Sequence, residues 1–419
     1  MKGGKILLTD MGGLVRHKAF KRWVGCMFTL AISMCLSGCW DRHELQERDF
    51  VLAVAIDRAD LGMAPGQGEK TTQVEEFVQP HGSKRYRLSF QILQLNPSNN
   101  SEGASKGSTS TSVISTTGES MLEMLWDLQG QSDKVLWFDH VQTIIISDAA
   151  ARQGGLEPML DFYHRNGQMR WLTKVVMTAG EARALLDYKP PSGEASGMFI
   201  ANSLRMYGKN SHVQGWHTDL GDISTSRDNQ KKVLMPLIEL VDDVVKLGGM
   251  AIFKNEQFVD YIDEYTTQGV KLMNGIEKSS IITFECPKHS GRIVAFQMLT
   301  HDTKLTPHVD NGAIYFTLDI TMTGNIGEVQ CGLRHDIVEI EEVETLEALT
   351  AEAVKRNILY SFHTYQRLKV DASIFGQTLA AFEPLEWQKV KDRWDDEVFP
   401  NLSLIVSVNV SIESVGNHK

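Results

Sequence analysis

The sequence predicts an α+β fold with several domains, in which mixed or antiparallel sheets are flanked by helices. Three observations predict it. Short apolar or alternating segments typical of strands recur along the whole chain. Helical patterns lie between them without the sustained βαβ repetition that a fully parallel sheet requires. The segment 341–369 carries apolar residues near helical spacing, with acids in its first turn and Arg367 and Lys369 in its last, which predicts a long C-terminal helix.

The N-terminal half is predicted from changes in periodicity. Residues 49–57 contain a continuous apolar run from Phe50 to Ile56 that is typical of a buried strand, whereas 85–95 alternates like a half-exposed strand. The Ser/Thr-rich stretch at 96–117 has too little apolar surface to offset chain ordering and is predicted to be a loop. The segments that follow predict helices at 121–128, 149–163, 179–188 and 194–207, and strands at 141–146 and 171–177.

The C-terminal half begins after a polar, poorly patterned stretch at 209–232. We expect strands at 233–241, 281–286, 292–299, 313–323 and 402–412, a hairpin at 250–262, and a helix at 263–274 that ends at Gly275. The predicted organisation is an N-terminal α+β region at 39–208 with two subdomains and the loop at 96–117, a connecting segment and strand at 209–245, and a C-terminal α+β domain at 246–415.

The N-terminus has the pattern of an export signal. Six Lys/Arg residues and one acid precede an apolar run from Trp23 to Leu36 of about 14 residues. A membrane-spanning helix needs roughly 20 residues, so we interpret residues 1–38 as a signal peptide that is removed. The long basic region leaves either Met1 or Met11 as the true start.

A bacterial lipobox is the best match for the residues that end this segment, which are Leu36, Ser37, Gly38 and Cys39. Diacylglycerol would alkylate the Cys39 thiol and cleavage would follow just before it. Two or three acyl chains anchor a protein stably to a membrane. The prediction is a lipoprotein on the outer face of a cytoplasmic membrane; the alternative is that Cys39 is an ordinary cysteine after an ordinary signal peptide.

The charge of the mature chain argues against two kinds of partner. Removing residues 1–38 takes away six Lys/Arg and one Asp, which leaves 36 basic and 52 acidic residues. Phosphate backbones are bound by Lys and Arg, so nucleic acid is not expected. A polybasic attachment to anionic lipid is excluded for the same reason, so the acyl chains must hold the protein at the membrane.

Cysteine use agrees with export. Cys286 and Cys331 are the cysteines that remain after the signal peptide and the acylated Cys39 are set aside. They either form one disulfide, which an oxidising compartment permits, or are two buried thiols in strands. No CxxC pair or metal-ligand spacing is present, and we expect no metal or cofactor.

The sequence contains few candidates for catalysis, and none forms a complete constellation. Ser105 lies in a formal G-x-S-x-G at 103–107 but lacks the strand and helix that would expose it. The adjacent acids Asp242–Asp243 and Asp395–Asp396 are interpreted as solvated surface rather than a glycosidase pair. The histidines His301, His308 and His335 and the pair Asp139–His140 have no zinc-protease spacing. We therefore predict no catalytic residue.

Several blocks, in the right order, resemble a known family. The start Cys39-Trp40-Asp41-Arg42-His43-Glu44-Leu45 is similar to the mature N-terminus of the Ger(x)C family, the C subunits of nutrient germinant receptors of spore-forming Firmicutes. The similarity continues at 54–57, 118–120, 136–141, 160–165 and 248–254, which covers most of the mature chain. The Ser/Thr-rich insert before Gly118 is longer than the family pattern, and Thr266 stands where an acid is expected, which puts the receptor subtype in doubt.

The resemblance implies a function. Members are accessory lipoproteins with three domains and no catalytic activity, at the outer surface of the spore inner membrane. They act beside integral membrane A-type and B-type germinant receptor subunits, one of them transporter-like, in assembly or signal transmission that nutrient-triggered germination requires. Direct binding of a small molecule by this subunit is not expected, and the nutrient stays unidentified.

Two alternatives share the anchor. A solute-binding lipoprotein of a transporter would have two similar α/β lobes with ligand between them, and the region after Val233 does not mirror the earlier half. An anchored cell-wall hydrolase would need a catalytic constellation, which the residues above do not supply.

Overall fold

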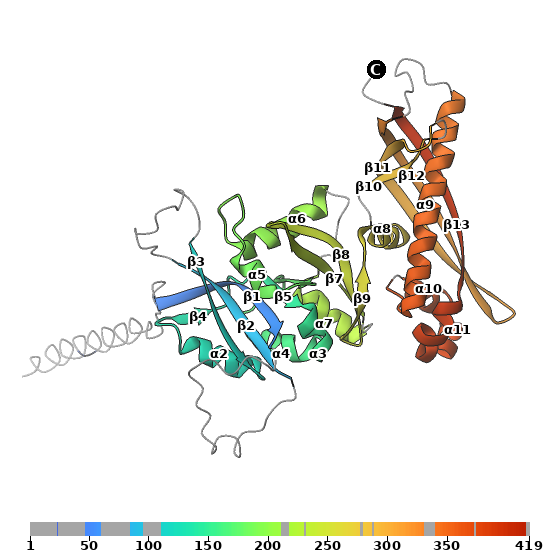
Figure 1. The fold of residues 1–419 in the computed structure, drawn as a ribbon. Helices are drawn as coiled ribbons and strands as arrows, with labels where there is room; N and C mark the ends of the chain where they lie inside the picture. The colour runs from blue at the N-terminus through green and yellow to red at the C-terminus, as the bar shows by residue number, and fades with distance from the viewer. Residues whose placement is uncertain are drawn as a thin grey trace, which may run out of the picture. The chain divides into compact units, whose positions relative to one another are not determined.

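The computed structural model describes residues 23, 47–59, 84–94, 110–210, 218–229, 232–276, 280–286, 289–330, 340–372 and 374–415. Two sheets organise the part of the chain from Asp49 onward (Figure 1). The fold is α+β with two mixed sheets, as the sequence predicts.

The larger sheet has nine strands, and its order is β3-β2-β1-β5-β6-β7-β8-β9 with β4 beside β1. The centre is parallel, because β1, β5 and β6 run in the same direction, and the two flanks are antiparallel. Its strands are β1 (Arg48–Arg58), β2 (Tyr86–Leu93), β3 (Thr111–Gly118), β4 (Val135–Trp137), β5 (Thr143–Ser147), β6 (Lys174–Thr178), β7 (Lys232–Val241), β8 (Val244–Lys254) and β9 (Gln257–Ile262).

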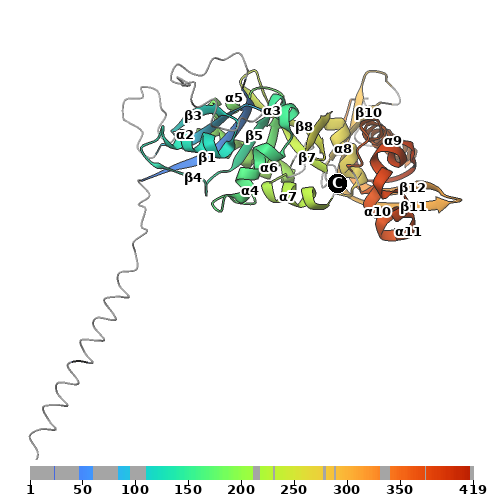
Figure 2. The same ribbon diagram turned by 90° about the horizontal axis from the view of Figure 1, so that it is seen from below.

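Helices cover both faces of this sheet because the central strands are apolar on both sides (Figures 1 and 2). Alternate residues of β1 show the division: Val54 and Ile56 enter a core with α2, α4 and α7, and Ala53 and Ala55 enter a second core with α5 and α6. The helices are α2 (Met121–Gln129), α3 (Asp148–Gly154), α4 (Glu157–Arg165), α5 (Ala182–Asp187), α6 (Ser196–Asn210) and α7 (Leu220–Asn229).

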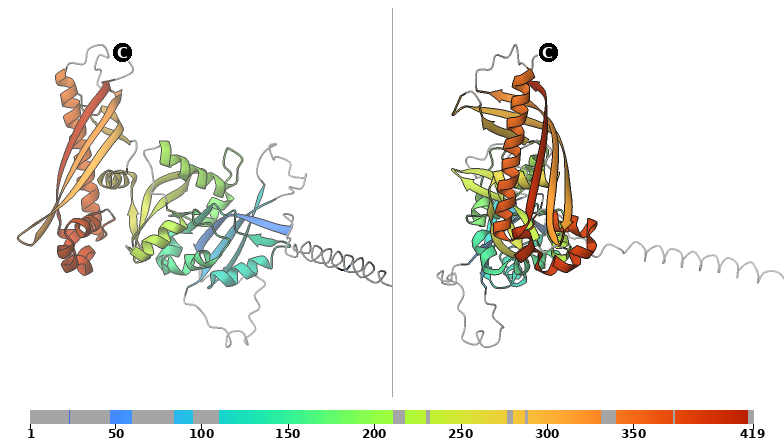
Figure 3. Two further views of the ribbon diagram at one scale, coloured as in Figure 1. Left: turned by 180° about the vertical axis from the view of Figure 1, so that it is seen from behind. Right: turned by 90° about the vertical axis from the view of Figure 1, so that its right-hand side faces the viewer.

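The smaller sheet has the order β10-β11-β12-β13, and only its last pair is parallel. One face alternates into a core against the long helix α9, whereas the other face is largely exposed (Figure 3). The elements of this region are β10 (Ser280–Glu285), β11 (Ile293–Asp310), β12 (Ala313–Val329), β13 (Ser403–Val415), α8 (Glu264–Met273), α9 (Ile340–Leu368), α10 (Phe375–Phe382), α11 (Pro384–Val390) and three short helical turns at Lys391–Arg393, Trp394–Val398 and Phe399–Asn401.

Strand β8 contributes side chains to the core of the smaller sheet and to a core of the larger sheet. Met250 and Ile252 point into the core of the smaller sheet, and Ala251 and Phe253 point into the core of the larger one. Successive side chains of a strand face opposite sides, so one strand joins two hydrophobic cores without a linker between them.

Several sequence predictions need correction. The loop predicted at 96–117 extends too far, because Thr111–Gly118 forms β3 on Tyr86–Leu93 of β2. The single helix predicted at 149–163 is two helices, broken at Gly155, whose φ of 73° lies in the left-handed region that favours glycine. The polar stretch before β7 contains α7, which the sequence pattern did not reveal.

Candidate functional site

The predicted lipobox residues Leu36, Ser37, Gly38 and Cys39 lie outside the described residues, which resume at Glu47 immediately before β1. Among the described helices, none is both long and apolar enough to cross a membrane. The start of β1 is therefore the structural reference point for the predicted anchor.

Strands β5 and β6 begin at the same end of the larger sheet, beside the middle of β1. The register places Ala53 of β1 beside Thr143 of β5, and Thr143 beside Lys174 of β6. Because these strands are parallel, the segments that precede β5 and β6 lie at the same end of the sheet, whereas β1 begins five residues earlier, at Arg48. The Gln142 N–H donates to Leu52 O at 2.8 Å and the Lys174 N–H donates to Gln142 O at 3.0 Å, so the edge is continuous.

An aromatic and a leucine stand exposed in the segment before β6. The sequence predicts a strand at 171–177, but β6 begins at Lys174, and Trp171 and Leu172 lie in the preceding turn. The prediction started the strand too early because Trp171 and Leu172 are apolar. No apolar alternation precedes them, which is the feature that could have separated them from the strand.

A buried carboxylate fixes α5 on one face of this sheet. Asp57 accepts hydrogen bonds from the Ala182 N–H at 2.7 Å and from the Arg183 N–H at 3.0 Å. N–H groups in the first turn of a helix have no partner within the helix, and Asp57 supplies one. Burial raises the pKa of Asp57, and the two backbone hydrogen bonds oppose that rise. This residue has a structural role in positioning α5.

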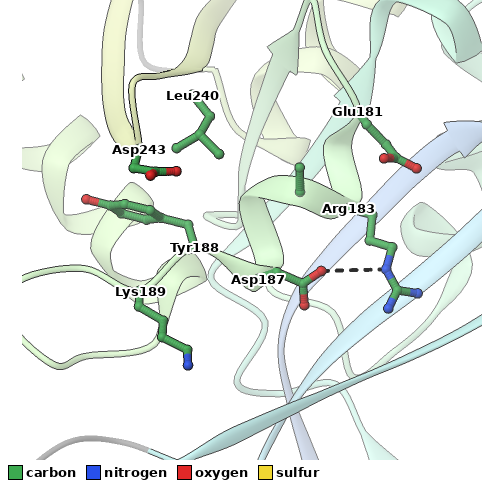
Figure 4. Close-up of a pocket in the computed structure, with 8 residues that line it drawn as sticks. Glu181, Arg183, Asp187, Tyr188, Lys189, Leu240 and Asp243 are labelled. Carbon is green, nitrogen blue, oxygen red and sulfur yellow. Dashed lines mark ion pairs between the residues drawn. The ribbon is translucent and has the colours of Figure 1, made fainter.

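A pocket of about 490 Å³ lies beside α5 (Figure 4). The charges in it are of both signs, and Arg183 Nε lies 3.6 Å from Asp187 Oδ2. Glu181 is paired with Arg87. Arg183 and Asp187 thus form an ion pair within the pocket, and the arrangement of its side chains does not define a particular ligand. The pocket is lined by Glu181, Arg183, Ala184, Asp187, Tyr188, Lys189, Leu240 and Asp243.

A cluster of charges, the lysine clasp, joins β7 and β8 to the segment after α9. It consists of Lys232, Lys254, Asp371, Asp395 and Asp396. Lys232 Nζ lies 2.7 Å from Asp395 Oδ1 and donates to the Asp371 carbonyl at 3.1 Å. Lys254 Nζ lies 2.9 Å from Asp396 Oδ1.

Asp371 is the buried member of the clasp. Its Oδ2 accepts from the Gly376 N–H at 2.7 Å and from Trp394 Nε1 at 2.9 Å. Burial raises the pKa of Asp371, and Lys232 is the strongest opposing influence. The pair Asp395–Asp396 was interpreted as solvated surface; this is wrong for Asp395, whose side chain is mostly buried against Lys232, and correct for the exposed Asp396.

The other catalytic candidates are dispersed. Asp242 and Asp243 form the turn between β7 and β8 with φ values of 51° and 58°. Asp139 accepts from Trp137 Nε1 at 3.0 Å, and the His140 ring contacts the Phe50 ring edge-on at a centroid distance of 5.0 Å. Each of these residues has a local structural role.

Two of the three histidines lie on β11. Burial lowers the pKa of His301, whereas His308 bonds to Thr317 Oγ1 at 3.0 Å and stacks on Tyr315. Ser105 and His335 lie outside the described residues. Among the residues that are described, no three His, Cys, Asp or Glu side chains form a group that could hold a metal ion.

Cys286 is disulfide-bonded, and Cys331 lies outside the described residues. Cys286 Sγ also lies 3.8 Å from His289 Nδ1, and its backbone N–H donates to Arg292 O at 2.8 Å. Of the two alternatives for Cys286, a buried thiol is therefore excluded.

The two sheets do not form the two similar lobes that a solute-binding protein requires. One is a nine-stranded mixed sheet covered on both faces, and the other is a four-stranded sheet covered by helices on one face. The architecture thus departs from the expectation of the solute-binding alternative.

Comparisons with known proteins agree with this architecture. Residues 41–240 match the family described as "Spore germination protein N-terminal domain", and residues 248–416 match "Spore germination B3/GerAC like, C-terminal". The break between the two matches falls in the β7–β8 hairpin.

Curated relatives are similar along nearly their whole length. The chain is 23% identical to spore germination protein YndF of Bacillus subtilis (strain 168), covering 95% of this chain and 98% of that protein. It is 24% identical to spore germination protein KC of the same organism, covering 92% of this chain and 95% of that protein.

A solved structure shares the fold. The crystal structure of the GerBC protein aligns with a TM-score of 0.56 at 17% sequence identity, covering 80% of this chain and 96% of that one. The two family matches together span most of the sequence and lie in the order that the structure shows. The chain therefore belongs to the GerAC family of spore germination proteins.

Proposed function

We propose that this protein is a lipid-anchored accessory subunit of a spore nutrient germinant receptor, held at the outer face of the spore inner membrane through Cys39. The observation that carries the proposal is the pair of family matches at 41–240 and 248–416, directly behind the segment Leu36–Cys39. Its partners would be the integral membrane A-type and B-type subunits, and its role would be assembly or signal transmission.

The packing of the two sheets supports a role in assembly or signal transmission, because their cores are joined through β8. Strand β8 contributes to both cores, and the lysine clasp adds ionic contacts between β7, β8 and the segment after α9. Close-packed interiors transmit displacement rather than absorb it. A partner that displaces the C-terminal region would therefore also displace the larger sheet, whose first strand, β1, follows the predicted anchor segment in the chain.

The test is Cys39→Ala in the native spore former. We expect the protein to leave the inner-membrane fraction and the release of dipicolinic acid after nutrient addition to drop, because the chain then lacks acyl chains to hold it. Release after a trigger that bypasses nutrient receptors should persist. Cys35→Ala is the matched control, since it removes another thiol from the same segment and should leave both responses unchanged.

Two results would contradict the proposal. A normal nutrient response with membrane-bound Cys39→Ala protein would show that Cys39 is not the essential anchor. A normal response to every nutrient after deletion of the whole gene, in a strain without other nutrient receptors, would remove the germination role itself.

A further inference from the structure

Strand β13 forms one edge of the smaller sheet and is long for an edge strand (Figure 3). It has 13 residues, whereas β10 at the opposite edge has six. From Ser403 to Ile412 its sequence contains no charged residue and no proline, and its register with β12 is regular over the same stretch. Proteins usually protect a free edge with charges, proline, a bulge or a short strand. This stretch of β13 has none of these four protections.

Helix α9 caps the two ends of this edge but not its middle. Gln366 Nε2 donates to Leu402 O at 3.0 Å, and the Ile412 N–H donates to Glu347 Oε1 at 2.8 Å. Both backbone groups face away from β12, and the direction of the backbone groups alternates along a strand. In the part of the chain that the structure describes, no side chain bonds to the residues of the same parity between the caps. These residues are Leu404, Val406, Val408 and Val410.

The other edges of the described strands are shorter or protected. Strand β10 pairs with only the first part of β11, and the unpaired part of β11 contains Asp302, Lys304 and Pro307. On β10 itself, Gln268 Nε2 donates to Ile281 O at 3.1 Å. At the edges of the larger sheet, β3 has eight residues and β9 has six. The uncharged stretch of β13 is therefore the longest unprotected edge among the described strands.

The chemistry of this edge favours a second copy of the chain as its occupant. An open edge accepts an extended strand, because a strand matches the alternating N–H and C=O groups along it. In a second copy β13 is already extended, so its backbone needs no further ordering. The mature chain has 52 acidic and 36 basic residues, and like charges oppose contact between two acidic surfaces. The stretch from Ser403 to Ile412 brings two copies together without placing like charges opposite each other.

The caps also select the register of such a pair. Ser407 lies midway between the two capped residues, so a two-fold axis at Ser407 matches the free stretch with itself and leaves the caps at the ends. Leu404 then lies opposite Val410 of the second copy, and Val406 lies opposite Val408, so apolar side chains meet on the core face. Each hydrogen-bonded antiparallel pair exchanges two bonds, which gives about eight bonds for the four free residues of each copy.

We propose that two copies of this protein pair through β13, antiparallel and about a two-fold axis at Ser407. The four strands of each smaller sheet then join into one continuous sheet of eight. Two-fold homodimers are the commonest oligomers of soluble proteins. This pairing goes beyond the proposed receptor role and does not depend on the lipidation of Cys39.

Ser407→Cys tests the pairing by disulfide formation between copies. Opposite residues of a non-hydrogen-bonded antiparallel pair have Cα atoms about 4.5 Å apart, which a disulfide can span. Ser411→Cys is the matched control, because Ser411 lies on the same exposed face of β13 but would be eight residues, or about 27 Å, from its counterpart. The full chain is oxidised with copper phenanthroline in an extract of disrupted spores that retains the membranes. Non-reducing gels and peptide mapping then identify the linked residues.

We expect a reducible dimer linked through position 407 for Ser407→Cys, and no dimer above the wild-type background for Ser411→Cys. A second pair of variants tests the association without a new cysteine. Ser407→Lys places two ammonium groups opposite each other, so light scattering of the full chain in detergent should change from dimer to monomer. Ser411→Lys should stay dimeric, and both variants should keep the wild-type circular dichroism spectrum because both side chains are exposed.

Three results would overturn the pairing. One is a folded Ser407→Cys chain that forms no link between copies, and another is equal linking at positions 407 and 411. A disulfide from position 407 to a different protein would identify another strand as the occupant of this edge. Each of these results leaves the germination role untouched, because the readout is a covalent link and the Cys39→Ala experiment tests that role separately.

Discussion

Lys232 and Lys254 lie directly opposite each other on β7 and β8, and both ammonium groups reach Asp395. Like charges at opposite positions of an antiparallel pair destabilise it. The repulsion is offset by carboxylates from a segment more than 100 residues away, Asp395 for Lys232 and Asp396 for Lys254. The C-terminal region thus supplies the carboxylates that offset this repulsion at the open end of the β7–β8 hairpin.

Removing one member of this clasp should therefore be costly. The side chains of Lys232 and Asp395 are only 17% and 19% exposed, and Lys232→Met leaves Asp395 without its closest cation. We expect the free energy of unfolding to fall by about 2 kcal/mol, between the values for exposed and fully buried ion pairs. Denaturant unfolding of the wild-type and variant chains measures it.

Arg165→Met supplies the control for the clasp prediction. Arg165 pairs with Asp161 at 2.8 Å, but both side chains are well exposed. Exposed ion pairs add little to stability, so this variant should unfold almost like the wild type. Equal losses in the two variants would show that the clasp is no more than a surface ion pair.

The buried Asp371 should make stability depend on pH. Its pKa is raised above the unfolded value of 3.8 by burial, so the folded state favours the protonated form. That contribution is present below pH 3.8 and is lost as pH rises through the raised pKa. Asp371→Asn cannot titrate, and the stability of the wild type relative to this variant should decline as pH rises across that window.

The stability of the wild type relative to Asp396→Asn should change with pH in the opposite direction. The hydrogen bond and charge of Lys254 lower the pKa of Asp396, so its contribution is present above 3.8 and is lost as pH falls through the lowered pKa. Urea unfolding at a series of pH values distinguishes the two variants. Parallel curves for the wild type and Asp371→Asn would show that Asp371 does not change protonation on folding.

Gly269 marks the closest approach of α8 to α9. A β-carbon there would lie 2.1 Å from Ser361 Oγ and 2.4 Å from Asn357 Oδ1. Overpacking costs about 1–3 kcal/mol, whereas replacing a helical glycine by alanine gains at most about 1 kcal/mol. Because the cost of the clash exceeds the gain in helix propensity, Gly269→Ala should lower the melting temperature.

Gly180→Ala is the matched control for this substitution. A β-carbon at Gly180 would have its nearest neighbour, Thr178 Oγ1, at 3.9 Å. This variant should melt within error of the wild type. A Gly269→Ala chain that melts at or above the wild-type temperature would show that the two helices can separate without loss.

The disulfide of Cys286 should stabilise the exported chain. Once residues 1–38 are removed and Cys39 is acylated, Cys331 is the expected partner. A loop of that size predicts a loss of about 4 kcal/mol on reduction in the chain-entropy model. Non-reducing peptide mapping identifies the partner, and rapid alkylation of Cys286 in the unreduced protein would contradict the bond.

Elements with a strong local pattern were predictable. The apolar run of β1, the alternation of β2 and the long periodic helix α9 each have enough residues to define their period, and the structure contains all three. Strand β3 was missed because its Ser/Thr-rich sequence has no apolar alternation; it forms by pairing with the apolar β2. Local propensity is weak where a neighbouring strand supplies the stability.

The α+β class and the family resemblance could be predicted from the sequence alone, because each depends on residues that are close together in the chain, and the export signal and the Cys39 lipobox stay predictions of the same kind. Tertiary contacts were needed to show that β8 contributes to two cores, that Lys232 and Asp395 meet, and that the first residues of β5 and β6 lie beside Ala53 in the middle of β1. These relationships join segments tens to more than 100 residues apart. Strand pairing and packing of the whole chain set such contacts, and no local pattern encodes them.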